Sequence, residues 1–219
     1  MYVMLLKQSM PTSNMPVVSV IIASYNHAQY LPECLNSILT QTYQDFEIVI
    51  VDDGSTDGSH ELLLDYQRRY PDKIRYYWHP EHANKGVSTT CNLALARAQG
   101  DYLAWVGSDD IWIPDKLARQ VDFLSHYPYL GMVYGQAFLI DENGNRHPGL
   151  MGHELSRDAL EQLLVANNAI CASTVMIRRL CLETIGFFNE KLAYSDWELW
   201  IRVATRYQIG YIPEPLVFY

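Results

Sequence analysis

The sequence predicts an α/β protein built on a doubly wound, mostly parallel sheet, with a less regular and partly antiparallel C-terminal half. Three observations support this prediction. Strand-like and helix-like segments alternate over the first half of the chain. The early strand segments are almost unbroken apolar, β-branched runs, as expected of strands buried on both faces. Polar loops follow those strands, at the edge where parallel sheets bind ligands.

The first half of the chain contains the regular part of this pattern. The apolar runs predict strands over residues 17–23, 46–51, 74–78 and 102–106. Helical spacing of apolar residues predicts helices over 31–39, 61–70 and 86–98. Pro32 falls in the first turn of the first predicted helix, where a missing N–H is tolerated.

The second half is less regular, and we expect antiparallel excursions there. Leu117, Val121 and Leu124 predict a helix, and a long strand is expected over 130–140 before a turn at 141–145. The remaining predicted elements are a helix over 158–165, a strand over 172–177, a helix over 197–207 and an extended run over 209–219. We expect residues 1–16 to be a loose leader and residues 17–219 to form a single domain.

Composition narrows the class of partner. The chain has 219 residues, and 16 Lys and Arg against 25 Asp and Glu give a net charge of −9. Such a field repels nucleic acid and anionic lipid, so we expect no nucleic-acid partner and a locally built site for any anionic ligand. The four cysteines lack metal or disulfide spacing, which favours a reducing, cytoplasmic compartment. No segment is long and apolar enough to span a bilayer.

Carboxylates follow predicted strands at two places and precede a predicted helix at a third. They are Asp52–Asp53, Asp109–Asp110 and Asp196. Paired carboxylates at a strand end suit Mg²⁺ or Mn²⁺, which complete their shells with water and phosphate oxygens. Aspartate also favours turns and helix N-caps, so each site has a purely structural alternative; Asp57 or Ser55 is expected to cap the second helix, and Asp196 its own. The chain has neither a P-loop nor a dinucleotide-binding glycine motif.

Six segments together resemble the family 2 glycosyltransferases of the GT-A fold. They are Val18-Ser-Val-Ile-Ile-Ala-Ser-Tyr-Asn26, Gln41-Thr-Tyr43, Val51-Asp-Asp-Gly-Ser-Thr-Asp57, Asn84-Lys-Gly86, Ala104-Trp-Val-Gly-Ser-Asp-Asp110 and Ser195-Asp-Trp-Glu-Leu-Trp200. The resemblance runs from Val17 to Tyr219. It implies a nucleotide-binding half over 17–110 and an acceptor-side half over 111–219, which we expect to be truncated.

The resemblance implies a nucleotide-binding set. Ala23, Ser24 and Tyr25 match the segment that lines the base, with the Tyr25 ring as a stacking face. Asp53 matches the carboxylate that accepts from the ring N–H of the base, which favours uracil or thymine. Asn84, Lys85 and Gly86 match a loop near the nucleotide. Purely structural roles remain as alternatives to nucleotide binding: Tyr25 could pack on its own helix, the Asp52–Asp53 pair could stabilise a turn, and Lys85 could be a solvated surface residue.

The resemblance also implies a metal ligand and a catalytic base. Asp110 matches the metal-binding end of the family's D-x-D signature, with Asp109 as a nearby sugar or ligand-orienting contact, although Gly107-Ser108 stands where the first acidic residue often lies. Asp196 matches the catalytic base, with Ser195 in place of the usual glutamate before it. Glu198 is the competing candidate, but it lies two residues along the predicted helix and so faces elsewhere.

Aromatic side chains are candidates for an acceptor platform. We expect Trp105 and Trp200 to lie in the core, on a buried strand and on the packed side of a helix. Trp112, just beyond Asp110, is the preferred acceptor-side candidate, and Trp197 is a second one.

These observations favour an inverting glycosyltransferase that moves a sugar from a nucleoside diphosphate donor, UDP-linked first, to a carbohydrate or lipid-linked acceptor hydroxyl, with Mn²⁺ or Mg²⁺ as cofactor. A lipid-linked acceptor would bring the cytoplasmic protein to the inner face of the membrane. The alternative is a non-catalytic nucleotide-sugar-binding module of the same fold. A sugar-nucleotide pyrophosphorylase is disfavoured, because Ser24-Tyr-Asn-His27 is not a Gly-rich basic phosphate loop.

Overall fold

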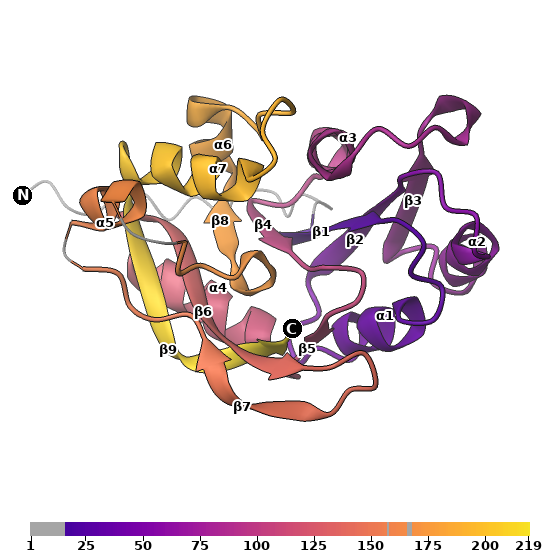
Figure 1. The fold of residues 1–219 in the computed structure, drawn as a ribbon, viewed down its shortest axis with the longest axis horizontal. Coiled ribbons are helices and arrows are strands. Elements are labelled where there is room, and N and C mark those ends of the chain that lie inside the picture. The colour runs from indigo at the N-terminus through magenta and orange to yellow at the C-terminus, as the bar shows by residue number, and fades with distance from the viewer. Residues whose placement is uncertain (1–15, 157, 166–167) are drawn as a thin grey trace, which may run out of the picture.

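The computed structural model describes residues 16–156, 158–165 and 168–219. In the first half, strands and helices alternate as predicted, with boundaries within two residues of those expected from the sequence (Figure 1). These elements are β1 (Val18–Ser24), α1 (Leu31–Leu39), β2 (Phe46–Asp52), α2 (Ser59–Arg69), β3 (Ile74–Trp78), η1 (Pro80–His82), α3 (Val87–Arg97) and β4 (Tyr102–Trp105).

The second half contains five elements that the sequence predicted and several that it did not. The predicted ones are α4 (Lys116–His126), β6 (Leu130–Ile140), α5 (Ala159–Val165), α7 (Ser195–Ala204) and β9 (Gln208–Phe218). The additional ones are β5 (Ile111–Trp112), β7 (Arg146–Met151) and α6 (Arg179–Ile185).

The strand predicted over 172–177 is wrong at its start. The short 3-10 helix η2 (Ala172–Thr174) comes first, and the strand β8 is Met176–Arg178. The carbonyl of Cys171 accepts both the Thr174 N–H and the Thr174 hydroxyl, at 3.0 and 2.7 Å. These two hydrogen bonds close a turn at the start of segment 172–177, whose composition alone predicts a strand.

The described strands form one sheet in the order β3-β2-β1-β4-β8-β6-β9-β5, with β7 paired to β6. The pairs β1–β2, β1–β4, β2–β3 and β6–β9 are parallel, whereas β4–β8, β6–β8, β6–β7 and β5–β9 are antiparallel. The predicted fold class, a mostly parallel sheet with a partly antiparallel C-terminal half, is therefore confirmed. β1 and β4 lie side by side, so their carboxyl ends meet at one edge.

Helices cover both faces of the sheet, which explains the unbroken apolar strands. Along β1, Val18, Val20 and Ile22 belong to the core cluster that includes side chains of α1, α2 and α4, whereas Ile21 belongs to the cluster on the opposite face, with side chains of α3, α6 and α7. The same alternation occurs in β2. Successive side chains of a strand point to opposite faces, so a strand covered on both sides is apolar at most positions. The buried polar side chains of Ser19 and Glu47 hydrogen-bond to each other.

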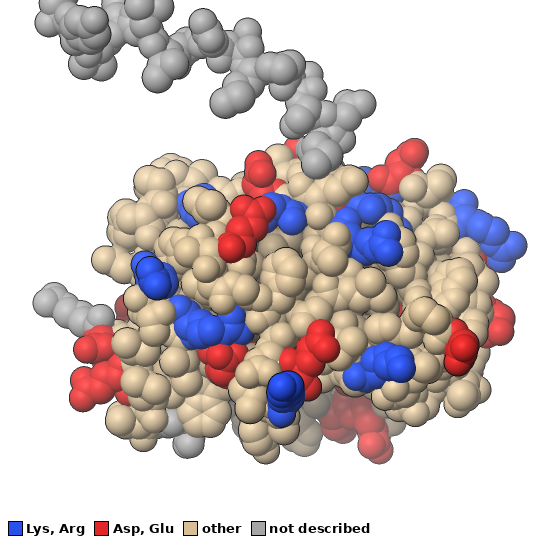
Figure 2. Space-filling model, turned by 90° about the horizontal axis from the view of Figure 1, so that it is seen from above, with Lys and Arg blue, Asp and Glu red and all other residues tan. Residues whose placement is uncertain are grey.

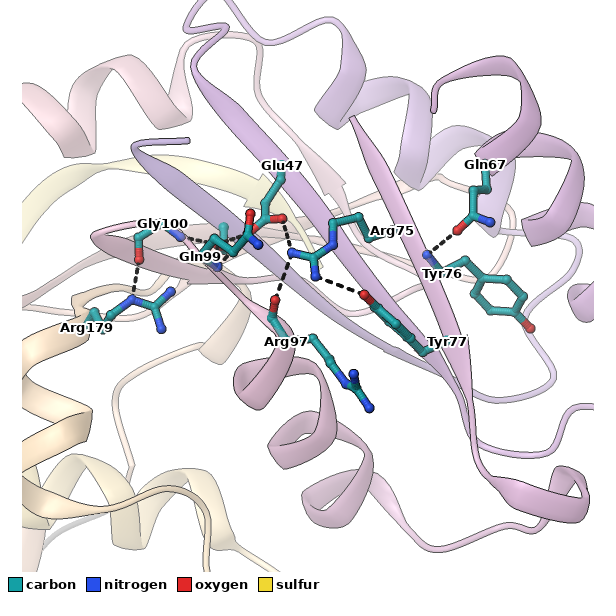
Figure 3. Close-up of polar contacts among 10 residues, drawn as sticks. Glu47, Gln67, Arg75, Tyr76, Tyr77, Arg97, Gln99, Gly100 and Arg179 are labelled. Carbon is teal, nitrogen blue, oxygen red and sulfur yellow. Dashed lines mark hydrogen bonds and ion pairs between the residues drawn. The ribbon is translucent and has the colours of Figure 1, made fainter. Parts of the chain in front are cut away.

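An ion pair with a buried carboxylate fixes α3 against the amino ends of the strands (Figure 3). Glu47 of β2 accepts from Arg75 of β3 at 2.8 Å, from the Ser19 hydroxyl at 2.6 Å and from the Gln99 N–H at 2.6 Å. The Arg75 guanidinium also donates to the carbonyl of Arg97, the last residue of α3, at 2.9 Å. These contacts hold the end of α3 opposite the one that faces the cleft described below.

Residues 1–15 of the expected leader lie outside the described residues. In the described part of the chain, no helix has the length and apolarity needed to cross a bilayer. Figure 2 shows one face of the molecule, on which basic and acidic side chains lie in small, separate groups among neutral residues.

Candidate active site

A cleft of about 1090 Å³ lies at the carboxyl ends of β1 and β4. It is lined by the ends of these strands, the loop after β4, the starts of α3 and α7, and the turn between β6 and β7. This is the edge at which ligands bind in open α/β sheets.

The cleft brings together four of the residues singled out from the sequence: Ala23, Asp109, Asp110 and Asp196. The other eight do not line it: Ser24, Tyr25, Asp53, Asn84, Lys85, Gly86, Trp112 and Trp197. The three aspartates come from the loop after β4 and the first turn of α7, so the fold joins segments that are distant in sequence.

Asp110 is a buried carboxylate, 4% exposed, in a tight turn after β4. Its N–H donates to the carbonyl of Gly107 at 3.0 Å, and its Oδ2 accepts from the Gly107 N–H at 3.2 Å and from the Ser173 hydroxyl. Burial raises the pKa of Asp110 to about 7; the charge of Asp109 acts in the same direction, and the two hydrogen bonds oppose it. A nearby cation would favour the ionised form.

Asp109 is the more accessible member of the pair. Its side chain is half exposed, with Oδ1 3.8 Å from Nδ1 of His27. The described residues contain no group of three or more His, Cys, Asp or Glu side chains that could hold a metal ion. The metal ligands available in the cleft are therefore one buried and one accessible carboxylate. These two ligands fit a hard cation that takes its other ligands from water and phosphate oxygens.

Asp53, at the end of β2, binds the backbone of the loop before α3. Its Oδ1 accepts from the Lys85 N–H at 2.6 Å, and its Oδ2 accepts from the Gly86 N–H at 3.0 Å. The Asp53 N–H donates to the carbonyl of Ser24 at 2.8 Å. Segments 23–25, 52–53 and 84–86 are thus neighbours at the carboxyl ends of β1 and β2, beside the cleft rather than in its lining.

The side chains of this neighbouring group differ in accessibility. Tyr25 is 46% exposed, and Asn84 and Lys85 are also exposed. Ser24 is buried, and its hydroxyl has no hydrogen-bond partner among the described residues. The expected cap of α2 by Asp57 or Ser55 is wrong, because the N-cap residue is Gly58; Asp57, just before it, accepts from the Ser59 N–H at 3.0 Å.

Asp196 lies in the first turn of α7, where the helix dipole favours a negative charge. Its Oδ2 lies 3.4 Å from the side-chain amide of Asn168. Glu198 is held elsewhere, in an ion pair with Arg202. Ser195, before Asp196, has its hydroxyl 2.6 Å from that of Ser88 on α3. The two hydroxyls join the helices on either side of this part of the cleft.

The two tryptophans expected on the acceptor side are not cleft residues. Trp112 is 2% exposed, and its indole N–H donates to the carbonyl of Ser173 at 3.2 Å. Lys116 lies over its ring, with Nζ 3.9 Å from the centroid. The expected acceptor platform at Trp112 is therefore wrong, because the ring is packed in the core. Trp197 is partly buried and donates to the carbonyl of Leu163 at 2.9 Å.

Sequence reasoning missed several residues of the cleft. Ser173 lines it and bonds to Asp110, but it lies in a segment that was expected to be a strand. Tyr219 lines it too, and burial together with the charges of Asp110, Asp109 and Asp196 raises the pKa of its hydroxyl. No local signal marks either residue. Trp105, expected in the core, is buried and also lines the cleft.

The chain is similar to known glycosyltransferases in sequence and in fold. The family model described as "Glycosyl transferase family 2" matches residues 19–185. An uncharacterized glycosyltransferase of Nostoc sp. is 38% identical over 188 residues, which cover 84% of this chain and 56% of the relative.

Two solved structures share the fold. TarS of S. aureus in complex with UDP has a TM-score of 0.75 at 24% identity, covering 92% of this chain and 60% of TarS. The mannosyltransferase PcManGT from Pyrobaculum calidifontis, in complex with GDP-Man and Mn²⁺, has a TM-score of 0.72 at 24% identity, covering 94% and 57%. The chain thus spans less than two thirds of the length of each of these three proteins.

Proposed function

The chain belongs to glycosyltransferase family 2, and on that premise we propose that it transfers a sugar from a nucleoside diphosphate sugar to an acceptor hydroxyl, with inversion at the anomeric carbon. The observation that best supports this activity is the meeting of Asp109 and Asp110 with Asp196 in one cleft. The first two suit a cation bound to a diphosphate, and the third suits a base beside the reacting sugar.

We propose that the nucleotide binds along segments 23–25, 52–53 and 84–86. The exposed Tyr25 ring offers a face for a base, and Asp53 offers acceptor lone pairs beyond those used by Lys85 and Gly86. Lys85 is available to offset diphosphate charge. UDP is the leading donor nucleotide; TarS, of the same fold, has been solved with UDP and with UDP-GlcNAc.

Asp110 would hold a divalent cation, Mn²⁺ or Mg²⁺, with Asp109 as an additional contact. Such a cation, when bound, neutralises charge that develops on a departing diphosphate. Support comes from the donor set described above and from the Mn²⁺ in the structure of PcManGT. The chain's own contribution is to hold one carboxylate in a fixed orientation at the end of β4.

Asp196 would act as the general base. An ionised carboxylate near the acceptor hydroxyl takes its proton as the oxygen attacks the anomeric carbon on the face opposite the leaving diphosphate. The amino end of α7 favours a negative charge at this position, and Asn168 orients one of the Asp196 oxygens. Asp196 thus has the freedom to meet an acceptor, which Glu198 lacks because of its pairing with Arg202.

The acceptor-side part of the proposal involves residues 111–219, as expected from the sequence. This part supplies the β6–β7 turn, the start of α7 and Tyr219 to the cleft. We further propose that residues 17–110 form the nucleotide-binding half and that the acceptor is a carbohydrate or is lipid-linked. The proposed location is cytoplasmic.

A donor screen tests the activity directly. The protein is incubated with UDP-GlcNAc, UDP-glucose, UDP-galactose and GDP-mannose, with Mn²⁺ or with chelator, and released nucleoside diphosphate is measured. Slow hydrolysis reports donor activation even without an acceptor. We expect release from one donor that depends on Mn²⁺ and is lost in Asp110→Asn. A folded wild-type protein that binds a nucleotide but releases none from any donor would favour the non-catalytic module instead.

A further inference from the structure

Ser173 touches the most buried carboxylate of the cleft. It is 4% exposed and lies in η2, in chain order 63 residues beyond Asp110. Its hydroxyl donates to Oδ2 of Asp110 and accepts from the Gly107 N–H at 2.9 Å. One hydroxyl therefore links both ends of the Gly107–Asp110 turn to a distant segment.

The turn that carries Ser173 is itself held from the side of α4. The Ser173 carbonyl accepts from the Trp112 indole at 3.2 Å, and the Thr174 carbonyl accepts from the Gln120 amide at 2.7 Å. Gln120 in turn accepts from Lys116 at 2.7 Å, and Nζ of Lys116 lies over the Trp112 ring. These side chains are all buried, so the position of Ser173 is determined by packing and by satisfied hydrogen bonds.

The consequence for Asp110 is a fixed orientation. Both of its described hydrogen-bond donors, Gly107 and Ser173, bind the same oxygen, Oδ2. No hydrogen bond to Oδ1 is formed by the described residues. A carboxylate held by one oxygen keeps the other available as a ligand, and such outer contacts are known to tune metal affinity.

We propose that Ser173 is a positioning residue for Asp110: its hydroxyl holds the carboxylate so that the second oxygen is presented to the divalent cation of a bound nucleotide. This inference rests on the proposed function, because it assumes a cation at Asp110. It also gives Trp112 a role that the sequence did not suggest, as a support for Ser173 rather than an acceptor platform.

A purely structural serine would make different predictions. If Ser173 only joined two loops, its removal would lower stability and leave the cation affinity of the folded protein unchanged. A positioning serine changes the affinity for Mn²⁺ in protein that remains folded, and leaves metal-free nucleotide binding as it was.

The test compares Ser173→Ala and Ser173→Thr with Ser59→Ala. Ser59 is a suitable control because it is also buried and its hydroxyl donates to a carboxylate, that of Asp57 at 2.6 Å, outside the cleft lining. Bound Mn²⁺ is measured by electron paramagnetic resonance of the free ion, first alone and then with UDP, after correction for UDP–Mn²⁺ in buffer. Nucleotide binding in chelator and thermal unfolding are measured on the same samples.

We expect Ser173→Ala to weaken Mn²⁺ binding about tenfold. Ser173→Thr, which keeps the hydroxyl, should restore most of the affinity, and Ser59→Ala should not change it. If Ser173→Ala fails to fold, Ser173→Cys replaces it, because a thiol is similar in size and a much weaker donor. Wild-type Mn²⁺ affinity in a folded Ser173→Ala or Ser173→Cys protein, or an equal loss in Ser59→Ala, would overturn the inference. Absence of Mn²⁺ binding by the wild type would overturn the cation site itself, and the positioning role with it.

Discussion

Arg202 binds both carboxylate oxygens of Glu198, with Nε 2.7 Å from Oε1 and Nη2 2.8 Å from Oε2. The same guanidinium donates to the carbonyls of Ile185, Gly186 and Phe187, which joins α7 to the end of α6. Glu198 therefore belongs to a structural cluster. Asp196, two residues earlier, faces the cleft instead.

This difference predicts separate effects for two neighbouring carboxylates. Asp196→Asn should lower the transfer rate by about 100-fold or more while leaving nucleotide binding intact, because only the base is lost. Glu198→Gln weakens a partly exposed ion pair, so it should cost about 1 kcal/mol of stability and leave the rate within a factor of a few. Donor turnover, calorimetric binding and urea unfolding distinguish these outcomes. Wild-type turnover in Asp196→Asn would exclude it as the base.

The buried Asp110 carboxyl predicts a pH dependence of stability in the absence of divalent cations. Its pKa in the folded protein, about 7, lies above the ordinary value of 3.8. The folded state therefore binds the proton more tightly, and this stabilisation is complete below about pH 4 and is lost as the pH rises toward 7. At pH 8, Asp110→Asn should be more stable than the wild type, by at most about 4 kcal/mol.

Urea unfolding with chelator at pH 5 and pH 8 checks this prediction. Asp141 provides a contrasting control, because hydrogen bonds from Asn145 lower the pKa of its carboxyl. Its stabilising contribution is complete above pH 3.8 and is lost only at lower pH, so the stability difference between Asp141→Asn and the wild type should be the same at pH 5 and at pH 8. If the free energy of unfolding of Asp110→Asn, relative to the wild type, does not increase between pH 5 and pH 8, the Asp110 carboxylate is not destabilised by burial.

Gly54 and Gly58 form a matched pair for testing how the nucleotide loops pack. Both have positive φ, +81° and +94°. A Cβ at Gly54 would lie 2.4 Å from the His82 carbonyl oxygen and 2.9 Å from the Asn84 nitrogen, whereas a Cβ at Gly58 would meet nothing within 4 Å. Gly58→Ala should therefore cost only the backbone strain, about 1 kcal/mol.

Gly54→Ala should cost at least about 3 kcal/mol and displace the loop that Asp53 binds. It should also weaken nucleotide binding more than Gly58→Ala does. Chemical unfolding and nucleotide titration of both variants test this. Equal effects of the two substitutions would mean that the close packing of residues 82–84 on Gly54 is not needed for binding.

The Glu47–Arg75 pair, whose carboxylate is buried, predicts a clear effect of removing Glu47 (Figure 3). Glu47→Ala takes one acceptor away from Arg75, from the Ser19 hydroxyl and from the Gln99 N–H, so it should cost about 2–3 kcal/mol. Asp65→Ala removes a half-exposed pair with Arg69 on α2 and should cost less than about 1 kcal/mol. The two free energies of unfolding can be compared in urea. Similar values would show that the network around Glu47 contributes little.

The sequence predicts the regular part of this fold well, for a local reason. β1 and β2 are apolar at successive positions because helices cover both faces, and that pattern is readable without tertiary information. The 130–140 strand is confirmed in full as β6. β5, with two residues, and β7, with exposed and polar residues, carry no such pattern. They exist because β9 and β6 offer them partners.

The site could be predicted only as far as its motifs extend. Asp109, Asp110 and Asp196 are marked by position after a strand or before a helix, and the fold brings them to one cleft. Ser173 has no local mark, because its role depends on a contact across 63 positions. Trp112 was expected on the acceptor side because it follows Asp110 closely in sequence. Its ring instead packs against Lys116, and its indole N–H donates to the Ser173 carbonyl.

The central claim is that this chain binds a nucleotide through a cation at Asp110. The most direct test is a calorimetric titration of UDP, dTDP, GDP and CDP into the protein, each with Mn²⁺, with Mg²⁺ and with chelator. We expect one nucleotide, UDP first, to bind tightly with a divalent cation and much more weakly with chelator or in Asp110→Asn. Absence of binding by all four nucleotides in a folded sample, or binding that ignores the cation, would contradict it.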